Sequence, residues 1–341
     1  MWMLRNRTPY AAERTWVLDK NAVKSWVVVV KGTFDICPDG STKIADKQED
    51  PLLACQYTGE PGKSSLLYEA DLTPSKPATD VILNGHVYAP AGKPTRSTLA
   101  TLTVGSHSKS IEAFGDRRWK KGLLGGLSLT RPEPFEKLPL VYERAFGGWD
   151  SVDKDKSKHR LYSKNPIGSG FWVTKEHAVD KPLPNFEDPR ELISSWKDRP
   201  RAMSFGALAS YWTPRLEYSG TYDDRWQKTR FPLLPENFDE RHYQAAPEDQ
   251  QVVDHLHGGE AVKLENLSST GVLTFTLPKI RFTFTTRFGK ERVEHRAKLS
   301  SVIIEPEIPR LMMVWHSSLE CHHKVDQLDE TIIGQKEFVS L

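Results

Sequence analysis

The sequence lacks most features that mark secreted or membrane-spanning proteins. Its 341 residues include three cysteines, Cys37, Cys55 and Cys321, without the paired spacing of a disulfide framework. The longest aliphatic run near the N-terminus covers only residues 27–30, whereas a spanning helix needs roughly 20 apolar residues. Residues 1–16 contain no apolar stretch typical of a secretory signal. These absences predict a cytoplasmic protein without a membrane partner.

The sequence also lacks an excess of charge of one sign. Lys and Arg number 47 and Asp and Glu number 45, which gives a formal net charge of +2. This balance argues against nucleic acid as a partner bound through bulk charge. Disorder is excluded by the same balance together with 10% aromatic residues, including ten Trp. The chain is therefore expected to fold around a sizeable core.

Signatures of catalysis and cofactor binding are missing as well. No G-x-S-x-G, P-loop or G-x-G-x-x-G pattern occurs in a suitable context. Histidines at 255 and 257, and His316 near residues 321–323, do not have the spacing of a four-ligand zinc site. We therefore predict no cofactor and no metal, and expect these histidines to be exposed to solvent.

The N-terminal part is rich in strand patterns. Residues 15–18 and 25–34 are rich in β-branched side chains and predict two strands. The unbroken valine run at 27–30 predicts burial on both faces of a sheet. Residues 97–104 alternate in polarity and predict a half-buried strand, paired in a hairpin with 110–114. Asn84 and Gly85 leave two interpretations open, a type I′ hairpin or one strand with a glycine bulge.

Strand patterns return near the C-terminus. Residues 271–278, 281–288, 291–296, 300–305 and 310–315 predict about five short strands, with Phe282, Phe284 and Phe288 on one face. Short strands at this spacing are typical of a sandwich or a barrel. The expected fold class is therefore mainly β, with sandwich- or barrel-like antiparallel sheets.

The middle of the chain, residues 121–259, is rich in loops and aromatic residues. Two short helices are predicted there, one over 189–196 with Asp188 as its N-cap and one over 246–256. We expect one domain over residues 1–341, in which β-rich parts at about 1–120 and 260–341 enclose an ordered, loop-rich middle segment.

Residues 139–150 (PLVYERAFGGWD) combine an apolar run, an adjacent acid and base, aromatic residues and a Gly-Gly pair. A hydrolase would need two carboxylates in different environments, and Glu143 with one of the acids at 116, 150 or 223 is a candidate pair. On a strand, however, Glu143 and Arg144 would point to opposite faces. The favoured interpretation is a set of structural ion pairs formed by Asp116, Arg117, Glu143 and Arg144.

Aromatic residues and arginines of the middle segment are the positive functional signal. Trp, Tyr and Arg dominate binding hot spots because they desolvate large areas while keeping a polar group. More than half of these aromatic side chains are expected in the core. The candidate partner-binding residues are Trp149, Trp172, Tyr211, Trp212, Arg215, Tyr222 and Trp226.

Several short motifs in one fixed order carry a family resemblance. They are DVILNGH at 80–86, GDRRW at 115–119, PLVYERAFGG at 139–148, NPIG at 165–168, LPN at 183–185, WTPR at 212–215, GTYD at 220–223, APEDQ at 246–250 and GGE at 258–260. Over about residues 10–320 the chain resembles the domain-of-unknown-function family 2169, which is encoded beside toxic effectors of bacterial type VI secretion systems.

The resemblance implies a non-enzymatic adaptor, or chaperone. Such a protein would bind a cognate effector toxin in the cytoplasm and assist its loading onto the VgrG spike protein. The family supplies no catalytic residues to assign to this chain. The alternatives are a carboxylate-dependent hydrolase, as described above, and a carbohydrate-binding β-sandwich that uses aromatic platforms.

Overall fold

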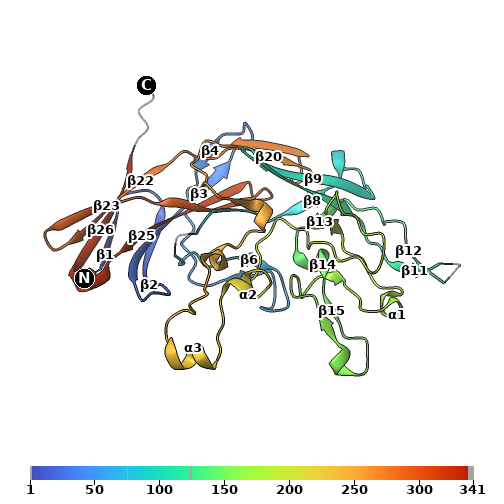
Figure 1. Cartoon of the computed structure of the whole chain (residues 1–341). Coiled ribbons are helices and arrows are strands. Elements are labelled where there is room, and N and C mark those ends of the chain that lie inside the picture. The colour runs from blue at the N-terminus through green and yellow to red at the C-terminus, as the bar shows by residue number, and fades with distance from the viewer. Residues whose placement is uncertain (1, 75, 123–124, 337–341) are drawn as a thin grey trace.

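The chain folds into three layers, which the computed structural model describes for residues 2–74, 76–122 and 125–336. A seven-stranded sheet forms the middle layer, and a five-stranded and a four-stranded sheet cover one of its faces (Figure 1). The part of the middle segment around Tyr142 and Trp212 packs on the opposite face. The prediction of a mainly β fold with antiparallel sheets and few short helices is confirmed, and the described residues form no closed barrel.

The seven-stranded sheet combines strands from the N-terminal and C-terminal parts of the chain. Its order is β19, β7, β24, β25, β3 and β2, with β4 paired to β3. The β24·β7 pair is parallel, whereas β3 pairs with both β25 and β2 in antiparallel register. The bounds are β2 Ala11–Leu18, β3 Lys24–Ile36, β4 Thr42–Ile44, β7 Thr79–Leu83, β19 Gln251–Val252, β24 Lys298–Glu305 and β25 Arg310–Glu320.

The valine run in β3 is buried on both faces of this sheet, as predicted. Val28 and Val30 point into the main core under the five-stranded and four-stranded sheets. Val27 and Val29 pack with Val314 of β25 on the opposite face. Because successive side chains of a strand alternate between faces, an unbroken apolar run can serve two layers at once.

The two covering sheets complete the main core. The five-stranded sheet has the order β18, β10, β9, β20 and β21, and the four-stranded sheet has the order β1, β26, β22 and β23. The hairpin predicted from residues 97–104 and 110–114 is confirmed as β9 and β10, and Phe282, Phe284 and Phe288 lie on the buried face of β22. The bounds are β1 Met3–Asn6, β9 Ser97–Val104, β10 His107–Phe114, β18 Phe186–Glu187, β20 Ala261–Glu265, β21 Val272–Thr276, β22 Arg281–Phe288, β23 Glu291–His295 and β26 Leu328–Lys336.

Short ladders and turns make up the remainder. The two-stranded ladders are β5 Gln56–Tyr57 with β6 Leu66–Tyr68, β8 His86–Tyr88 with β13 Lys137–Pro139, β11 Trp119–Lys121 with β12 Leu127–Leu129, β14 Phe146–Gly147 with β17 Ser169–Gly170, and β15 Trp149–Asp150 with β16 Arg160–Leu161. The helices are α1 Lys175–Ala178, α2 Arg215–Tyr218 and α3 Asp224–Thr229. The 3₁₀ turns are η1 Pro90–Gly92, η2 Tyr142–Arg144, η3 Lys156–Lys158, η4 Glu240–Tyr243, η5 Glu248–Gln250 and η6 His322–Gln327.

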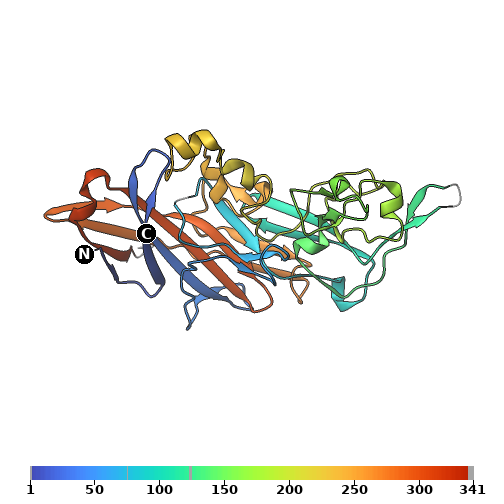
Figure 2. The same ribbon diagram turned by 90° about the horizontal axis from the view of Figure 1, so that it is seen from below.

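The middle segment forms two units with separate cores. Residues around Trp119, Phe146 and Leu183 enclose a small core of their own. A second cluster, which includes Trp212 and Tyr142, packs against the face of the seven-stranded sheet that points away from the covering sheets. Viewed from below, the helices of the second unit and the ladders of the first lie at different places along the molecule (Figure 2). The aromatic residues of the segment are thus divided between these two cores, the main core, which contains Phe135, Phe186 and Phe205, and the surface.

Both predictions of a helix in the middle segment are wrong. Residues 189–196 form turns and bends. The Asp188 carboxylate, expected to cap a helix, accepts hydrogen bonds from the side chains of Arg190 and Arg201. Residues 246–256 form η5 and β19, since Gln251 and Val252 pair with β7 at the edge of the sheet. A sheet edge that offers backbone partners has overridden a local helical pattern.

Neither interpretation of Asn84 and Gly85 holds. β7 ends before these residues and β8 begins after them, but the two strands do not pair with each other. β7 pairs with β24 and β19, whereas β8 pairs with β13. The dipeptide is therefore a corner at which the chain leaves the seven-stranded sheet for a separate ladder.

Candidate functional site

Residues 139–150 form a 3₁₀ turn and short ladders and not one continuous strand. Glu143 and Arg144 belong to η2, and their side chains bind different parts of the chain. Both carboxylate oxygens of Glu143 accept hydrogen bonds from Ser65, at 3.0 Å from the backbone N and 2.5 Å from Oγ. Arg144 Nη1 lies 2.9 Å from Asn185 Oδ1 and 3.5 Å from Asp116 Oδ1. This turn connects three parts of the chain.

The glycines of this stretch allow a close backbone approach. A Cβ atom on Gly147, whose φ is +153°, would lie 2.2 Å from the carbonyl oxygen of Asn165. The buried Asn165 side chain donates to the carbonyls of Tyr142 and Phe146 at 2.8 and 3.1 Å. Only glycine permits this contact. The densest motif of the sequence is therefore explained by packing and backbone hydrogen bonds.

The carboxylates of the hydrolase hypothesis lie in different surroundings. Glu143 and Asp116 line one shallow hollow, whereas Asp150 and Asp223 lie outside it. Asp150 accepts from Val173 N and His177 Nδ1, both at 2.8 Å. Burial raises the pKa of Asp150, but these hydrogen bonds outweigh it and hold that pKa below its ordinary value. Asp223 caps α3. Each of the four carboxylates accepts hydrogen bonds or caps a helix.

The predicted ion-pair residues and histidines are placed as follows. Arg117 is buried and pairs with Glu187, whose carboxylate also accepts from Ile193 N. His316 is buried and not exposed, which corrects the expectation. Its Nε2 lies 2.6 Å from the Asp71 carbonyl, and burial lowers its pKa to about 4. Neutral His316 is thus part of the interior.

Two motif residues form buried polar centres. Asp80 accepts from Lys76 Nζ at 2.7 Å and from the backbone of Ala245 at 2.8 Å. Arg215 Nη1 lies 2.5 Å from Glu69 Oε2. Burial raises the pKa of Glu69, but the charge of Arg215 and hydrogen bonds outweigh it, so that this pKa lies below its ordinary value. The Asp80 centre attaches the middle segment to β7 of the seven-stranded sheet, and the Arg215 centre attaches it to the residues that follow β6.

The seven predicted partner-binding residues do not form one surface. Trp212 is fully buried against Tyr142, and Arg215 is buried as well. Trp172 and Trp226 are half-buried. Trp149, Tyr211 and Tyr222 are exposed, but Trp149 lies on the β15·β16 ladder and Tyr222 lies beside α3. Buried Trp212 and Arg215 are not available to a partner.

The segment around α3 carries an exposed aromatic cluster. Trp226 is at its centre, with ring centroids of Tyr222 at 4.7 Å and Phe231 at 5.7 Å. Its indole donates to the Leu233 carbonyl at 2.9 Å, and Asp223 Oδ1 accepts from the Trp226 backbone at 2.8 Å. Tyr222 is 53% exposed and Phe231 is 68% exposed. We call Tyr222, Trp226 and Phe231 the α3 aromatic cluster.

The α3 aromatic cluster projects from the body of the protein. Figure 1 shows α3 extending beyond α2, on the side of the seven-stranded sheet opposite the covering sheets. Such a projection with apolar rings at its tip is suited to protein contact. Sequence reasoning missed Phe231, because nothing local distinguishes an exposed from a buried phenylalanine.

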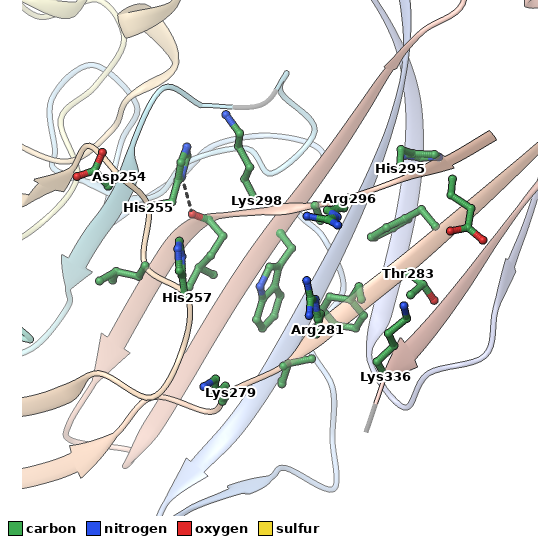
Figure 3. A pocket seen from close by; sticks show the side chains of 18 residues that line it. Asp254, His255, His257, Lys279, Arg281, Thr283, His295, Arg296, Lys298 and Lys336 are labelled. Atoms are coloured by element: carbon green, nitrogen blue, oxygen red, sulfur yellow. Dashed lines mark hydrogen bonds between the residues drawn. The ribbon is translucent and has the colours of Figure 1, made fainter. Parts of the chain in front are cut away.

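A second surface feature is a groove in the covering layer (Figure 3). It lies where the five-stranded and four-stranded sheets separate and measures about 750 Å³. Its floor includes the buried side chains of Leu299, Trp315 and Phe284. Its walls come from residues 254–257, the link between β21 and β22, and the crossing from β23 to β24.

The groove is lined mainly by positive charge. Asp254 and Glu294 are its acidic residues. Its basic residues, all exposed, are Lys279, Arg281, Arg296, Lys298 and Lys336. Sequence reasoning missed this group because the five cations come from separate segments around the groove. The only local signal was the clustering of bases at residues 279–281 and 296–298.

The comparisons with known proteins identify a family. Residues 21–316 match the family described as "Uncharacterized protein conserved in bacteria (DUF2169)", so the chain belongs to that family. No curated protein and no solved structure matches the chain significantly. Within the described residues, no helix has the length and apolar character needed to cross a membrane.

Proposed function

We propose that the chain is a non-enzymatic adaptor that binds a cognate type VI effector toxin in the cytoplasm and assists its loading onto the VgrG spike. The proposal rests on membership of the DUF2169 family and on the resemblance that links this family to effector genes. The observation that carries it is the α3 aromatic cluster, an exposed apolar surface on a projecting segment.

The α3 aromatic cluster has the chemistry of a protein-binding hot spot. Tyr222 and Phe231 offer apolar area that a partner can cover, and Trp226 holds the two rings in place from between them. Arg230 fixes the base of the projection through bonds to the carbonyls of Leu234 and Lys20. Because these rings are ordered before binding, their side chains lose little further entropy when a partner covers them.

Cytoplasmic binding and delivery can be tested separately. The full chain is expected to co-purify with the toxin encoded beside it, and deletion of its gene is expected to remove that toxin from the VgrG spike. Delivery of toxin to the spike at the wild-type level without this chain would refute the adaptor role. The assay needs no assumption about which surface makes the contact.

The hydrolase alternative has its own test. Glu143→Gln keeps one acceptor oxygen for Ser65 and removes the negative charge. An adaptor should capture and deliver the toxin as well with this substitution as without it. Loss of delivery from a folded Glu143→Gln variant that still captures the toxin would favour an enzymatic step.

A further inference from the structure

We propose that the groove in the covering layer binds an extended acidic segment of a protein partner, which adds to the four-stranded sheet beside the first residues of β22. The proposal rests on the proposed function as a binding protein and specifies the chemistry of one bound segment. It concerns a surface separate from the α3 aromatic cluster.

An unpaired stretch of strand borders the groove. β22 pairs with β26 along its whole length, from Arg281 opposite Lys336 onwards. Its other neighbour, β23, pairs only as far as Phe284 opposite His295. Beyond that point the chain leaves for β24, so that Arg281–Thr283 have no strand partner on this side among the described residues. An extended peptide can pair with such an edge through its backbone.

The charge at this edge favours an acidic peptide. Arg281 and Arg296 lie beside the open stretch, and Lys298 lies farther along the groove beside His255 (Figure 3). Among the described residues, no ion pair engages these three cations. Across the whole groove, five Lys and Arg face two carboxylates. Alternate side chains of a bound strand point to opposite faces. Acidic side chains could therefore meet the cations while apolar ones cover the Trp315 and Phe284 floor.

His255 in the wall is consistent with a hydrogen-bonded ligand. Its backbone has φ +58°, an uncommon conformation for a residue other than glycine. Its Nδ1 lies 3.2 Å from the Leu299 carbonyl, which requires the proton on Nδ1 in the neutral ring. Burial lowers the His255 pKa, which favours that ring form. Its buried Nε2 has no hydrogen-bond partner among the described residues.

A peptide fits these observations better than a nucleic acid does. Single-stranded nucleic acid is bound by exposed aromatic faces along a basic path. Here the aromatic floor residues Phe284 and Trp315 are buried, while an open strand edge is available. The volume lies within the roughly 300–1,000 Å³ of ordinary ligand sites, which suits a short segment and not a folded domain.

A random seven-residue peptide library displayed on phage and selected on the purified full chain tests the proposal. We expect enrichment of segments with Asp or Glu at alternate positions. For the dominant peptide, labelled and measured by fluorescence anisotropy, Arg281→Glu with Arg296→Glu should weaken binding by about tenfold or more, with a steep dependence on salt. Lys290→Glu, in the exposed β22–β23 turn outside the groove, is the matched control and should change affinity less than about twofold.

Methylation of backbone nitrogens at alternate positions of the same peptide should remove binding, because it blocks strand pairing. No acidic enrichment, equal affinity of the double variant, or equal affinity of the methylated peptide would each overturn the proposal. Binding of a single-stranded DNA oligonucleotide in place of acidic peptides would also overturn it. A Tyr222→Ala, Phe231→Ala variant should still bind the peptide, so failure of the groove and failure of toxin capture are distinguishable.

Discussion

Arg215 Nη1 lies 2.5 Å from Glu69 Oε2, with 5% of the arginine side chain and 12% of the glutamate side chain exposed. The same guanidinium donates to the carbonyls of Leu208 at 2.5 Å and His242 at 3.0 Å. Glu69 follows β6, whereas Arg215 begins α2, so the pair joins the middle segment to the N-terminal part. Arg215, which the sequence predicts to bind a partner, therefore forms a buried ion pair that connects two parts of the chain.

Removal of Arg215 should therefore destabilise the fold. Arg215→Met leaves Glu69 buried without its cation, which costs about 3–5 kcal/mol of unfolding free energy. Urea denaturation measures the loss. The matched control is Arg225→Met. The Arg225 Nη2 atom lies 3.8 Å from Glu236 Oε2 on the surface, and loss of this exposed pair should not measurably change the free energy of unfolding. Equal stabilities of the two variants would contradict the assigned role of the buried pair.

Truncation of Trp212 should destabilise the fold strongly, whereas truncation of Trp149 should have little effect on stability. Trp212 is fully buried, with its ring centroid 5.5 Å from that of Tyr142, and Trp212→Ala should cost about 3–5 kcal/mol. Trp149 is 60% exposed, and Trp149→Ala should change stability by less than about 0.5 kcal/mol. Thermal unfolding of both variants gives the comparison. A large loss in the Trp149 variant would show that its ladder is packed differently.

Acid should destabilise the protein through His316. Burial lowers its folded pKa to about 4, compared with 6.5 for an ordinary histidine. The unfolded chain therefore takes up a proton below pH 6.5 that the folded chain accepts only near pH 4, so stability falls as pH decreases across this interval. His316→Gln should have a shallower pH dependence of its unfolding free energy between these values. An unchanged slope would mean that His316 does not carry this effect.

The strand pattern was predictable because it is local. The valine run at 27–30 and the phenylalanines at 282, 284 and 288 are placed on their faces by the two-residue period of a strand. The parallel pairing of β24 with β7 was not predictable, since it depends on contacts between distant parts of the chain. A second long-range pairing, that of β19 with β7, explains why residues 246–256 contain β19 and a 3₁₀ turn in place of the expected helix.

The candidate sites were less predictable, because exposure is decided by tertiary packing. Trp212 and Tyr222 are both aromatic residues of the loop-rich middle segment, yet Trp212 is buried and Tyr222 is exposed to solvent. The groove joins bases that are more than fifty positions apart, such as Lys279 and Lys336. No spacing rule connects such residues before the sheets are assembled.

The most direct test of the adaptor role is the affinity of the full chain for the neighbouring toxin, with and without the α3 aromatic cluster. Tyr222→Ala with Phe231→Ala removes two exposed rings and should leave the unfolding temperature unchanged. Hot-spot truncation of this kind costs about 2 kcal/mol or more, so the dissociation constant from calorimetry should rise by roughly thirtyfold or more. Val272→Ala, which truncates a 53% exposed side chain on β21 in the covering layer, serves as the control. Equal affinity of the wild type and the double variant would contradict binding through α3, and no measurable affinity of the wild-type chain would contradict the adaptor role itself.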